Sequence, residues 1–347
     1  NLTGMGSPFF PLFNRGKISV QLDLSTDAGR DALDRLLKTA DIFVDNFRDQ
    51  SLAKMGADPV DLRAKFPNLI LASHKGFLEG PYKNRTAMDE VVQMMTGLAY
   101  MTGPTGLPLR FGSSAIDIFG GLFGAFAAMG ALMERQNSGK GRDIRVGLFE
   151  SGLLFAAQHM VQFELEGTSP PPMPERDFSW PVYDIMETAD GRQIFVGAVT
   201  EGQWDALCGY LGLDELLADA RLQSRMDQIN ARSWTIPIVE KAIGERNYRQ
   251  LLEDFENLGI PFSPINKPSE LFEDPHVLRD GGLVRSNTAD GRTFRAPALP
   301  FEIDGRMMSA SGDLPSIGQE TNRILSELGL SEAEIEAARG PLKAAAE

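Results

Sequence analysis

The chain has 347 residues, more than one hydrophobic core usually contains, so two domains or one domain with a large insertion are expected. Hydrophobic residues make up 42% and charged residues 24%, which is typical of folded globular proteins and excludes a mainly disordered chain. The formal net charge of −14 argues against broad nucleic-acid binding, because a phosphate backbone requires a basic surface. A polyanionic ligand would therefore need a local basic pocket. The candidate cations for such a pocket are Arg15, Lys17, Lys54, Lys75, Lys83 and Arg85. The alternative is that most of them are solvated surface charges.

Neither export nor a membrane span is expected. The single cysteine, Cys208, excludes an internal disulfide framework, and the first residues lack the basic end and apolar stretch of a secretory signal. We therefore expect a cytoplasmic protein. The longest apolar stretch, 118–133, is interrupted by glycines and ends at Glu134, so we interpret it as a buried helix.

Strands and helices alternate in the first part of the chain. Alternating apolar residues predict a half-buried strand over 18–24, and Ser25 and Thr26 can cap a helix that runs through Leu37. This alternation predicts an α/β domain with a parallel sheet. The next predicted elements are a buried strand over 42–47, a helix, a strand over 69–73, helices over 89–98 and 117–135, a strand over 144–148 and a helix over 153–163.

A proline-rich segment, 168–174, is the strongest linker candidate. A hairpin that turns at Asp190 and Gly191 is predicted after it. Mainly helices follow up to Leu258, and then comes a turn-rich passage over 259–265. The last predicted features are a second hairpin at Asp290 and Gly291 and a capping box, beginning at Ser331, that opens the final helix.

Common catalytic motifs are absent: the sequence has no G-x-S-x-G, no Walker loop, no H-E-x-x-H and no G-x-G-x-x-G. The three histidines, His74, His159 and His276, have no metal-ligand spacing, so no metal site is expected. His159 lies in an apolar helix, where a buried structural histidine is expected rather than a catalytic one. A chain this poor in His and Cys needs a nucleophile that requires no general base, and an ionised carboxylate meets that need.

Asp117 is the carboxylate that we single out. Small residues on both sides of it, over 112–121, leave room for a bulky substrate. It also opens a long helix, whose terminal N–H groups stabilise negative charge. The alternative, on this local pattern alone, is that Asp117 only caps the helix.

Seven segments, in their order and spacing, resemble the class III CoA transferase family. That family includes formyl-CoA transferase, the carnitine CoA transferase and the α-methylacyl-CoA racemases, and the likeness covers essentially the whole chain. The segments are 14–24, 40–48, 74–82, 115–121, 139–142, 259–266 and 314–321.

The resemblance implies a catalytic role for Asp117. Its carboxylate would attack an acyl-CoA thioester to form an aspartyl anhydride, then an aspartyl-CoA thioester, from which CoA passes to an incoming carboxylic acid. The CoA thioester is a substrate, and no permanently bound cofactor is implied. Asp89, an electrostatic or orienting group, supports the site together with Gly120 and Gly121. The CoA contacts carried over from the family are Asn46, Phe47, Lys54, Met55 and Lys75, the lysines meeting phosphates while Phe47 and Met55 offer apolar surface.

The family fold implies a Rossmann-like large domain completed by the C-terminal segment, a smaller α+β domain, and two interlocked chains in a homodimer. Acyl-CoA and a carboxylic acid would be the other partners, with no nucleic acid or membrane. The expected limits are the first part of the large domain at 1–165, a linker at 166–182, the small domain at 183–265 and a return segment at 266–347.

The sequence departs from the family pattern at three places. The family's first strand, turn and helix have no counterpart ahead of Asn1, as expected of a fragment. The glycine-rich loop of formyl-CoA transferase is replaced by the passage 176–183. Met88 stands where the racemase branch has a histidine, and Met cannot exchange a proton.

A transferase is therefore favoured, with an α-methylacyl-CoA racemase as the alternative and a non-catalytic acyl-CoA binding protein as a third possibility. Arg110, Arg176 and Trp180 favour a small dicarboxylic acid as substrate, such as succinate or a methylated C4 to C5 diacid. It is equally open that both arginines pair with surface carboxylates.

Overall fold

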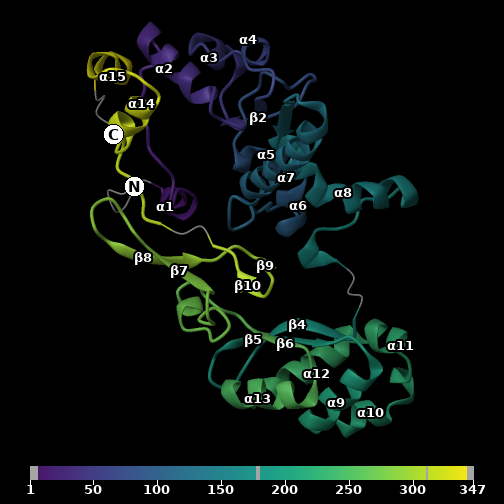
Figure 1. Cartoon of the computed structure of the whole chain (residues 1–347). Helices are drawn as coiled ribbons and strands as arrows, with labels where there is room; N and C mark the ends of the chain where they lie inside the picture. The colour runs from purple at the N-terminus through teal and green to yellow at the C-terminus, as the bar shows by residue number, and fades with distance from the viewer. Residues whose placement is uncertain (1–6, 177–179, 310–311, 342–347) are drawn as a thin grey trace. The chain divides into compact units, whose positions relative to one another are not determined.

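The computed structural model describes residues 7–176, 180–309 and 312–341 of a mixed α/β chain (Figure 1). The chain divides into two compact units. The first contains Asn1–Arg176 and Leu283–Glu347, and the second is Asp177–Gly282.

A parallel sheet forms the centre of the first unit. Its strands are β1 (Ile42–Asp45), β2 (Ile70–Lys75) and β3 (Asp143–Gly147), in the order β1-β2-β3. The register places Asp45 opposite Ser73 and Lys75 opposite Gly147. Because parallel strands run in the same direction, their carboxyl ends meet at one edge of the sheet.

The strand expected over 42–47 differs from its prediction in length and burial. β1 ends at Asp45, and the side chain of Val44 is 62% exposed. The physical reason is its position, since β1 pairs only with β2 among the described strands and forms an edge of the sheet. The central strand β2, in contrast, is buried from Ile70 to Ser73.

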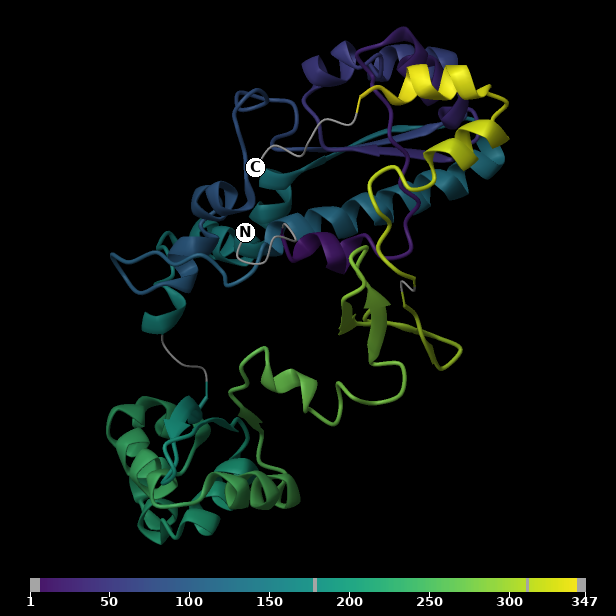
Figure 2. The ribbon, with the colours of Figure 1, turned by 90° about the vertical axis from the view of Figure 1, so that its left-hand side faces the viewer.

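Helices pack on both the sheet and one another. Helix α7 (Ala115–Ser138) runs along one face of the sheet against β2 and β3 (Figure 2), and Gly139, with a φ of 65°, ends it. A cluster of apolar side chains from Leu37 to Leu71 joins further helices to β2. The helices of this part are α1 (Phe9–Phe13), α2 (Asp27–Leu37), α3 (Asp49–Lys54), α4 (Pro59–Lys65), α5 (Asp89–Met95), α6 (Leu98–Thr102), α7, α8 (Leu148–Glu166) and a 3-10 turn η1 (Met173–Glu175).

Helix α7 is not buried as the sequence predicted. One stripe along it, Leu122, Phe126, Met129 and Met133, is between 63% and 74% exposed. The glycines and alanines on its other face pack on the sheet, which explains why composition alone suggested full burial. Among the described residues, α7 is also the helix whose length and apolar composition would suffice to cross a membrane.

The C-terminal segment returns to the first unit. Helices α14 (Thr321–Glu327) and α15 (Glu332–Arg339) pack with α2 around a core that contains Ala32, Leu325 and Ile335 (Figure 1). The capping box predicted at Ser331 is confirmed, with both of its hydrogen bonds present. This segment also contains two hairpins, of which the one predicted at Asp290 and Gly291 is β7 (Leu283–Asn287) with β8 (Thr293–Pro297), and the other is β9 (Glu302–Ile303) with β10 (Arg306–Met307).

The strand predicted over 18–24 is absent. The segment instead contacts the C-terminal helices, where Ser19 O accepts from Glu320 N and Asp23 N donates to Ala338 O. Its alternating apolar residues Val20 and Leu22 pack against that helical core rather than in a sheet. The period of two was therefore detected correctly, but it reflects an extended segment without a strand partner.

The second unit combines a small antiparallel sheet with helices. The hairpin predicted at Asp190 and Gly191 is confirmed as β4 (Val182–Glu187) paired with β5 (Gln193–Ala198). The passage over 259–265 is not only a turn, because β6 (Phe262–Pro264) adds to β5 there. The helices, which enclose a core around Trp204 and Phe255, are α9 (Glu201–Leu211), α10 (Asp214–Ala218), α11 (Arg225–Asn230), α12 (Arg232–Gly244), α13 (Tyr248–Leu258) and the 3-10 turns η2 (Ala220–Leu222) and η3 (Glu270–Phe272).

Candidate active site

A cavity of about 870 Å³ opens at the carboxyl ends of the three parallel strands. Residues that directly end or follow β1, β2 and β3 line it, and the first turn of α7 forms part of its wall. This is the edge where open parallel sheets bind their ligands. The lining residues used below are Asn46, Phe47, His74, Lys75, Met88, Asp89, Glu90, Ser114, Asp117, Gly120, Gly121 and Leu148.

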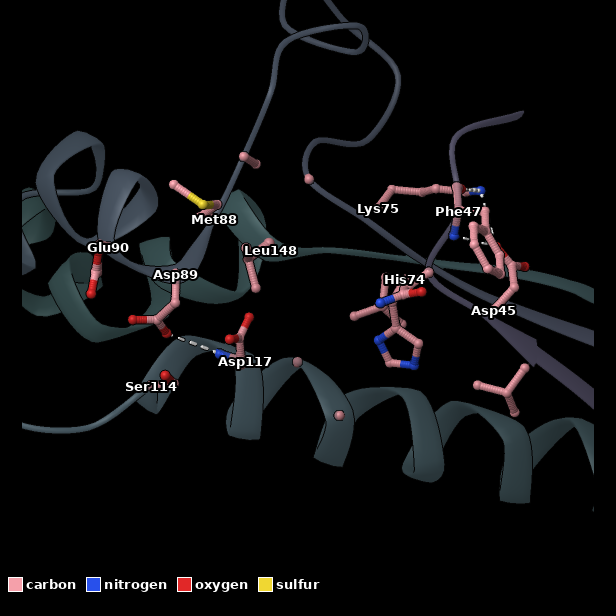
Figure 3. A pocket seen from close by; sticks show the side chains of 17 residues that line it. Asp45, Phe47, His74, Lys75, Met88, Asp89, Glu90, Ser114, Asp117 and Leu148 are labelled. Carbon is pink, nitrogen blue, oxygen red and sulfur yellow. Dashed lines mark hydrogen bonds and ion pairs between the residues drawn. The ribbon is translucent and has the colours of Figure 1, made fainter. Parts of the chain in front are cut away.

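The side chain of Asp117 points from α7 into this cavity (Figure 3). The N-cap residue of α7 is Ser114, so Asp117 occupies the third position of the helix and is not its cap. The simple capping alternative is therefore wrong for Asp117. A carboxylate in the first turn is still stabilised by the positive end of the helix dipole.

Asp89 replaces the missing cap of α7. Ser114 makes no side-chain capping bond, and the Asp89 carboxylate, from α5, accepts hydrogen bonds from the backbone N–H groups of Ile116 at 2.9 Å and Asp117 at 3.1 Å. Gln93, one turn further along α5, donates to the other Asp89 oxygen. Asp89 is 5% exposed, so its orientation is held by these bonds rather than by solvent.

Two effects raise the pKa of the Asp117 carboxyl above its ordinary value. Desolvation by the surrounding protein is the larger, and the negative charge of Asp89 is the second. The side chain remains open to the cavity, and the protein atoms around it still remove part of its hydration. Both effects make the carboxylate more basic, and hence a stronger nucleophile, than a fully solvated aspartate.

Gly120 and Gly121 lie one turn beyond Asp117 and leave the cavity wall free of side chains. A Cβ added to Gly121 would meet no described atom within 4 Å, whereas one added to Gly120 would lie 3.6 Å from Ser151 Oγ. The space next to Gly121 is therefore open to a substrate, and the space next to Gly120 is limited by α8.

A second, basic pocket of about 360 Å³ adjoins the cavity and shares Asn46, Phe47, His74 and Lys75 with it. The cations that line it are Arg48, Lys75, Lys83, Arg85 and Arg145, against the acidic Asp49 and Glu79. Among the described residues Arg48 and Arg85 form no ion pair; Arg48 donates to Thr86 Oγ1 at 2.8 Å, and the Arg85 guanidinium lies 4.7 Å from the Tyr82 ring centroid. These two cations are available to an anionic ligand.

The expected CoA contacts separate into two groups. Asn46, Phe47 and Lys75 line both the cavity and the basic pocket. Lys75 Nζ is held by Asp49 at 2.9 Å and by the Phe47 carbonyl at 2.7 Å. Lys54 and Met55, at the end of α3, line neither space, and Met55 packs against the apolar cluster beneath the sheet.

Sequence reasoning missed His74, Arg48 and Arg145. His74 was set aside because it has no metal-ligand partner, yet it lines both the cavity and the basic pocket. Its position at the end of a predicted central strand was the available signal, because that edge of a parallel sheet is where ligands bind. Arg145 lies within the predicted strand over 144–148 rather than at its end, so this signal did not apply to it.

His159 is not the buried structural histidine that was expected. It is partly exposed on α8, close to Gln158, and lines a separate, mainly apolar pocket of about 320 Å³. The reason is that α8, like α7, packs through one face only, with Met160 and Val161 more than half exposed.

Arg110, one of the three residues that suggested a dicarboxylate, lies beside the cavity. Arg110 pairs with Glu90, which lines the cavity, so its guanidinium lies at the rim. Arg176 belongs to the first unit and Trp180 to the second. Asp177, Phe178 and Ser179, in the passage that replaces the family's glycine-rich loop, lie outside the described residues.

Comparison with known proteins places these features in a family. The family model described as CoA-transferase family III matches residues 2–321. A succinate–glutarate CoA-transferase of Agrobacterium fabrum is 30% identical over 93% of this chain and 81% of its own length, and a succinyl-CoA:mesaconate CoA-transferase of Haloarcula marismortui is 26% identical over 93% and 82%. The crystal structure of a CAIB/BAIF family protein from Brucella suis has a TM-score of 0.83 and 28% identity, covering 92% of this chain and 84% of that one.

Proposed function

This chain belongs to CoA-transferase family III and transfers coenzyme A between carboxylic acids, as its sequence predicted, and we propose that it does so through Asp117 between short dicarboxylates. The observation that carries the proposal is the position of Asp117. It is a carboxylate with a raised pKa, in the first turn of a helix, facing a cavity at the carboxyl edge of the parallel sheet.

The proposed reaction begins when an Asp117 oxygen attacks the acyl carbon of the donor thioester. The carbon–sulfur bond breaks, which gives an acyl-aspartyl anhydride and CoA thiolate. The thiolate attacks the aspartyl carbon and releases the first acid, leaving an aspartyl-CoA thioester. The acceptor carboxylate then attacks this thioester, the thiolate leaves again, and its attack on the acceptor carbon forms the new acyl-CoA and restores Asp117.

Asp89 is proposed to support each step in which Asp117 carries a covalent group. Because Asp89 accepts from the N–H groups of Ile116 and Asp117, it fixes the first turn of α7. Its negative charge also disfavours the ionised form of Asp117, which favours the neutral anhydride and thioester forms over the free carboxylate. Gly120 and Gly121 leave room for the thioester beside the helix.

The nucleotide end of CoA is proposed to bind in the basic pocket. The 3′-phosphate and diphosphate need cations, and Arg48 and Arg85 form no ion pair there among the described residues. Phe47 and Asn46, at the boundary of the two spaces, would contact the middle of the molecule. Lys54 and Met55 remain predictions of the family resemblance, since they line neither space.

Short dicarboxylates are proposed as both donor acid and acceptor. The relatives described above are named for succinate, glutarate and mesaconate. Arg110, at the rim of the cavity, could exchange its partner Glu90 for the second carboxylate of such an acid. Met88 supports transfer over racemisation, because it faces the cavity and cannot take a proton from a substrate α-carbon.

An interlocked homodimer and a Rossmann-like large domain are proposed as well. The exposed apolar stripe of α7 supports the dimer, because a surface of this kind is usually covered by another protein chain. Light scattering after gel filtration would test it, and Phe126→Glu should then reduce the mass to that of one chain. The sequence-based domain limits and a cytoplasmic location stay predictions.

The function is tested by mixing the purified chain with succinyl-CoA and a panel of carboxylic acids, and measuring new acyl-CoA products by mass spectrometry. Transfer to C4 and C5 diacids, and little to monocarboxylic acids, is expected. Hydroxylamine added during turnover should modify Asp117, since it traps aspartyl anhydrides and thioesters. Modification confined to another carboxylate would contradict the site. Incorporation of solvent deuterium at the α-carbon of a chiral 2-methylacyl-CoA, without an acceptor, would instead support the racemase alternative.

A further inference from the structure

His74 combines three features that no role above explains. It is the last residue but one of the central strand β2, it lines both the cavity and the basic pocket, and its ring nitrogens have no hydrogen-bond partner within the described ranges. The neighbouring cation at that boundary already has partners, since Lys75 bonds to Asp45, Asp49 and the Phe47 carbonyl. An unpaired, half-buried ring facing a cavity requires either water or a ligand as its partner.

The ring of His74 packs directly against Gly124 of α7. A Cβ added to Gly124 would lie 2.4 Å from His74 Cε1 and 2.6 Å from Nε2, so any larger residue at 124 would displace the imidazole. Gly124 is itself buried in the interior of a helix, where glycine is less favourable than alanine. The close approach of the His74 ring explains why position 124 is a glycine rather than a larger residue.

The contact with Gly124 also fixes how far His74 lies from the reacting carboxylate of Asp117. Gly124 follows Asp117 by two turns of α7, which is about 10 Å along the helix axis. Figure 3 shows both side chains directed into the same cavity. His74 is therefore placed between the reacting carboxylate and the basic pocket.

We infer that His74 is a positioning residue for the pantetheine arm of coenzyme A, hydrogen-bonding the arm's second amide. The inference rests on the proposed function, because it assumes the thioester at Asp117 and the phosphates in the basic pocket. In the arm, the second amide nitrogen is roughly seven covalent bonds from the sulfur, or about 9 Å when extended. That length matches the separation along α7.

The chemistry of the ring fits an amide. Burial lowers the pKa of His74, while the Asp45 carboxylate acts in the opposite direction. A neutral imidazole presents one N–H donor and one nitrogen acceptor, and an amide offers both complementary groups. A hydrogen bond from His74 to the flexible pantetheine arm would hold the sulfur of CoA next to Asp117. His74 would thus orient the substrate without taking part in bond making or breaking.

The inference is tested with donors of decreasing length in combination with His74→Phe. Succinyl-CoA and succinyl-pantetheine both contain the second amide, whereas succinyl-N-acetylcysteamine ends before it. With glutarate as acceptor, His74→Phe should lower kcat/KM about tenfold for the two longer donors and less than about twofold for the short one. His74→Gln, which keeps a donor and an acceptor, should recover most of the loss. His159→Phe, the same change in the separate apolar pocket, should affect none of the donors.

Two outcomes would overturn the inference while leaving the proposed function intact. An equal loss with all three donors would mean that His74 acts on folding or on Asp117 itself, and no loss with any donor would mean that it is not used. If the wild-type chain transferred from none of the donors, the proposed function would fail, and this inference with it.

Gly124→Ala provides a second test, in which residue 74 remains a histidine. Because the added methyl displaces the ring, the variant should show the same dependence on donor length as His74→Phe. In a His74→Ala background the substitution should have no further effect on kcat/KM, which a double-mutant cycle measures. Additive losses of kcat/KM in that cycle would contradict the packing of the His74 ring against Gly124.

Discussion

The Asp89 carboxylate, which belongs to α5, accepts a hydrogen bond from the backbone N–H of Asp117, on α7, at 3.1 Å. The two carboxylates are thus coupled in two ways. Asp89 holds the helical turn that carries Asp117, and its charge raises the pKa of the Asp117 carboxyl. The position of the nucleophile and its basicity therefore depend on the same neighbour.

Asp89→Asn separates these two contributions. Asn keeps an acceptor oxygen for the N–H groups but removes the charge, so the pKa of Asp117 should decrease. Because Asp117 attacks in its ionised form, the acidic limb of the profile of kcat/KM against pH should move to lower pH. A profile that stays in place, or moves to higher pH, would contradict the electrostatic role. Glu134→Gln, at the far end of α7, is the matched carboxylate-to-amide control and should leave the profile unchanged.

Asp117→Asn should abolish transfer and stabilise the fold. A carboxyl whose pKa is raised on folding binds its proton more tightly in the folded state, so stability falls as pH rises through that raised pKa. At neutral pH the wild type carries this penalty and the amide does not. We expect kcat to fall by at least about 10³-fold, with a Tm at pH 7 at or above that of the wild type. A lower Tm would indicate that the ionised side chain contributes to folding.

Arg48 and Arg85 should contribute to CoA affinity through the phosphates. Replacing either by Ala should raise KM for succinyl-CoA about three- to tenfold, because one charge-assisted hydrogen bond is removed. KM for succinyl-pantetheine, which lacks the phosphates, should not change. Lys54→Ala lies outside both spaces and should have the smaller effect. A larger effect of Lys54 than of the two arginines would mean that the nucleotide binds elsewhere.

Gly121→Ala is expected to gain stability and lose activity. An added Cβ meets no described atom within 4 Å, and alanine is more favourable than glycine in a helix by about 1 kcal/mol. The methyl, however, would occupy the space proposed for the thioester next to Asp117. Thermal unfolding should show a higher Tm, while kcat/KM decreases. Unchanged activity would show that the substrate does not pass this face of α7.

Local signals in the sequence were sufficient for part of the fold. The hairpin at Asp190 and Gly191 and the capping box at Ser331 depend on a few neighbouring residues, and both are confirmed. The extended segment over 18–24 was predicted as a strand because period two reports an extended backbone and does not report a strand partner. Burial of α7 was overestimated for a similar reason, since composition does not distinguish the two faces of a helix.

For the site as well, the sequence predicted features that depend on neighbouring residues and did not predict those that depend on contacts between distant residues. Asp117 could be selected from its own helix terminus and its small neighbours. Its coupling to Asp89, 28 residues earlier, became visible only with the packing of α5 on α7. The same holds for Arg48, Arg85 and Arg145, which meet because parallel strands gather distant residues at one edge.

The central claim, that a covalent group passes through Asp117, is tested most directly with heavy oxygen. An acceptor labelled in its carboxylate loses one oxygen to the aspartate when CoA thiolate attacks the acceptor carbon of the anhydride. After one turnover, peptide mass spectrometry should locate one heavy oxygen in the Asp117 side chain. Label that appeared only in water, in the acids or in another carboxylate of the chain would contradict the account.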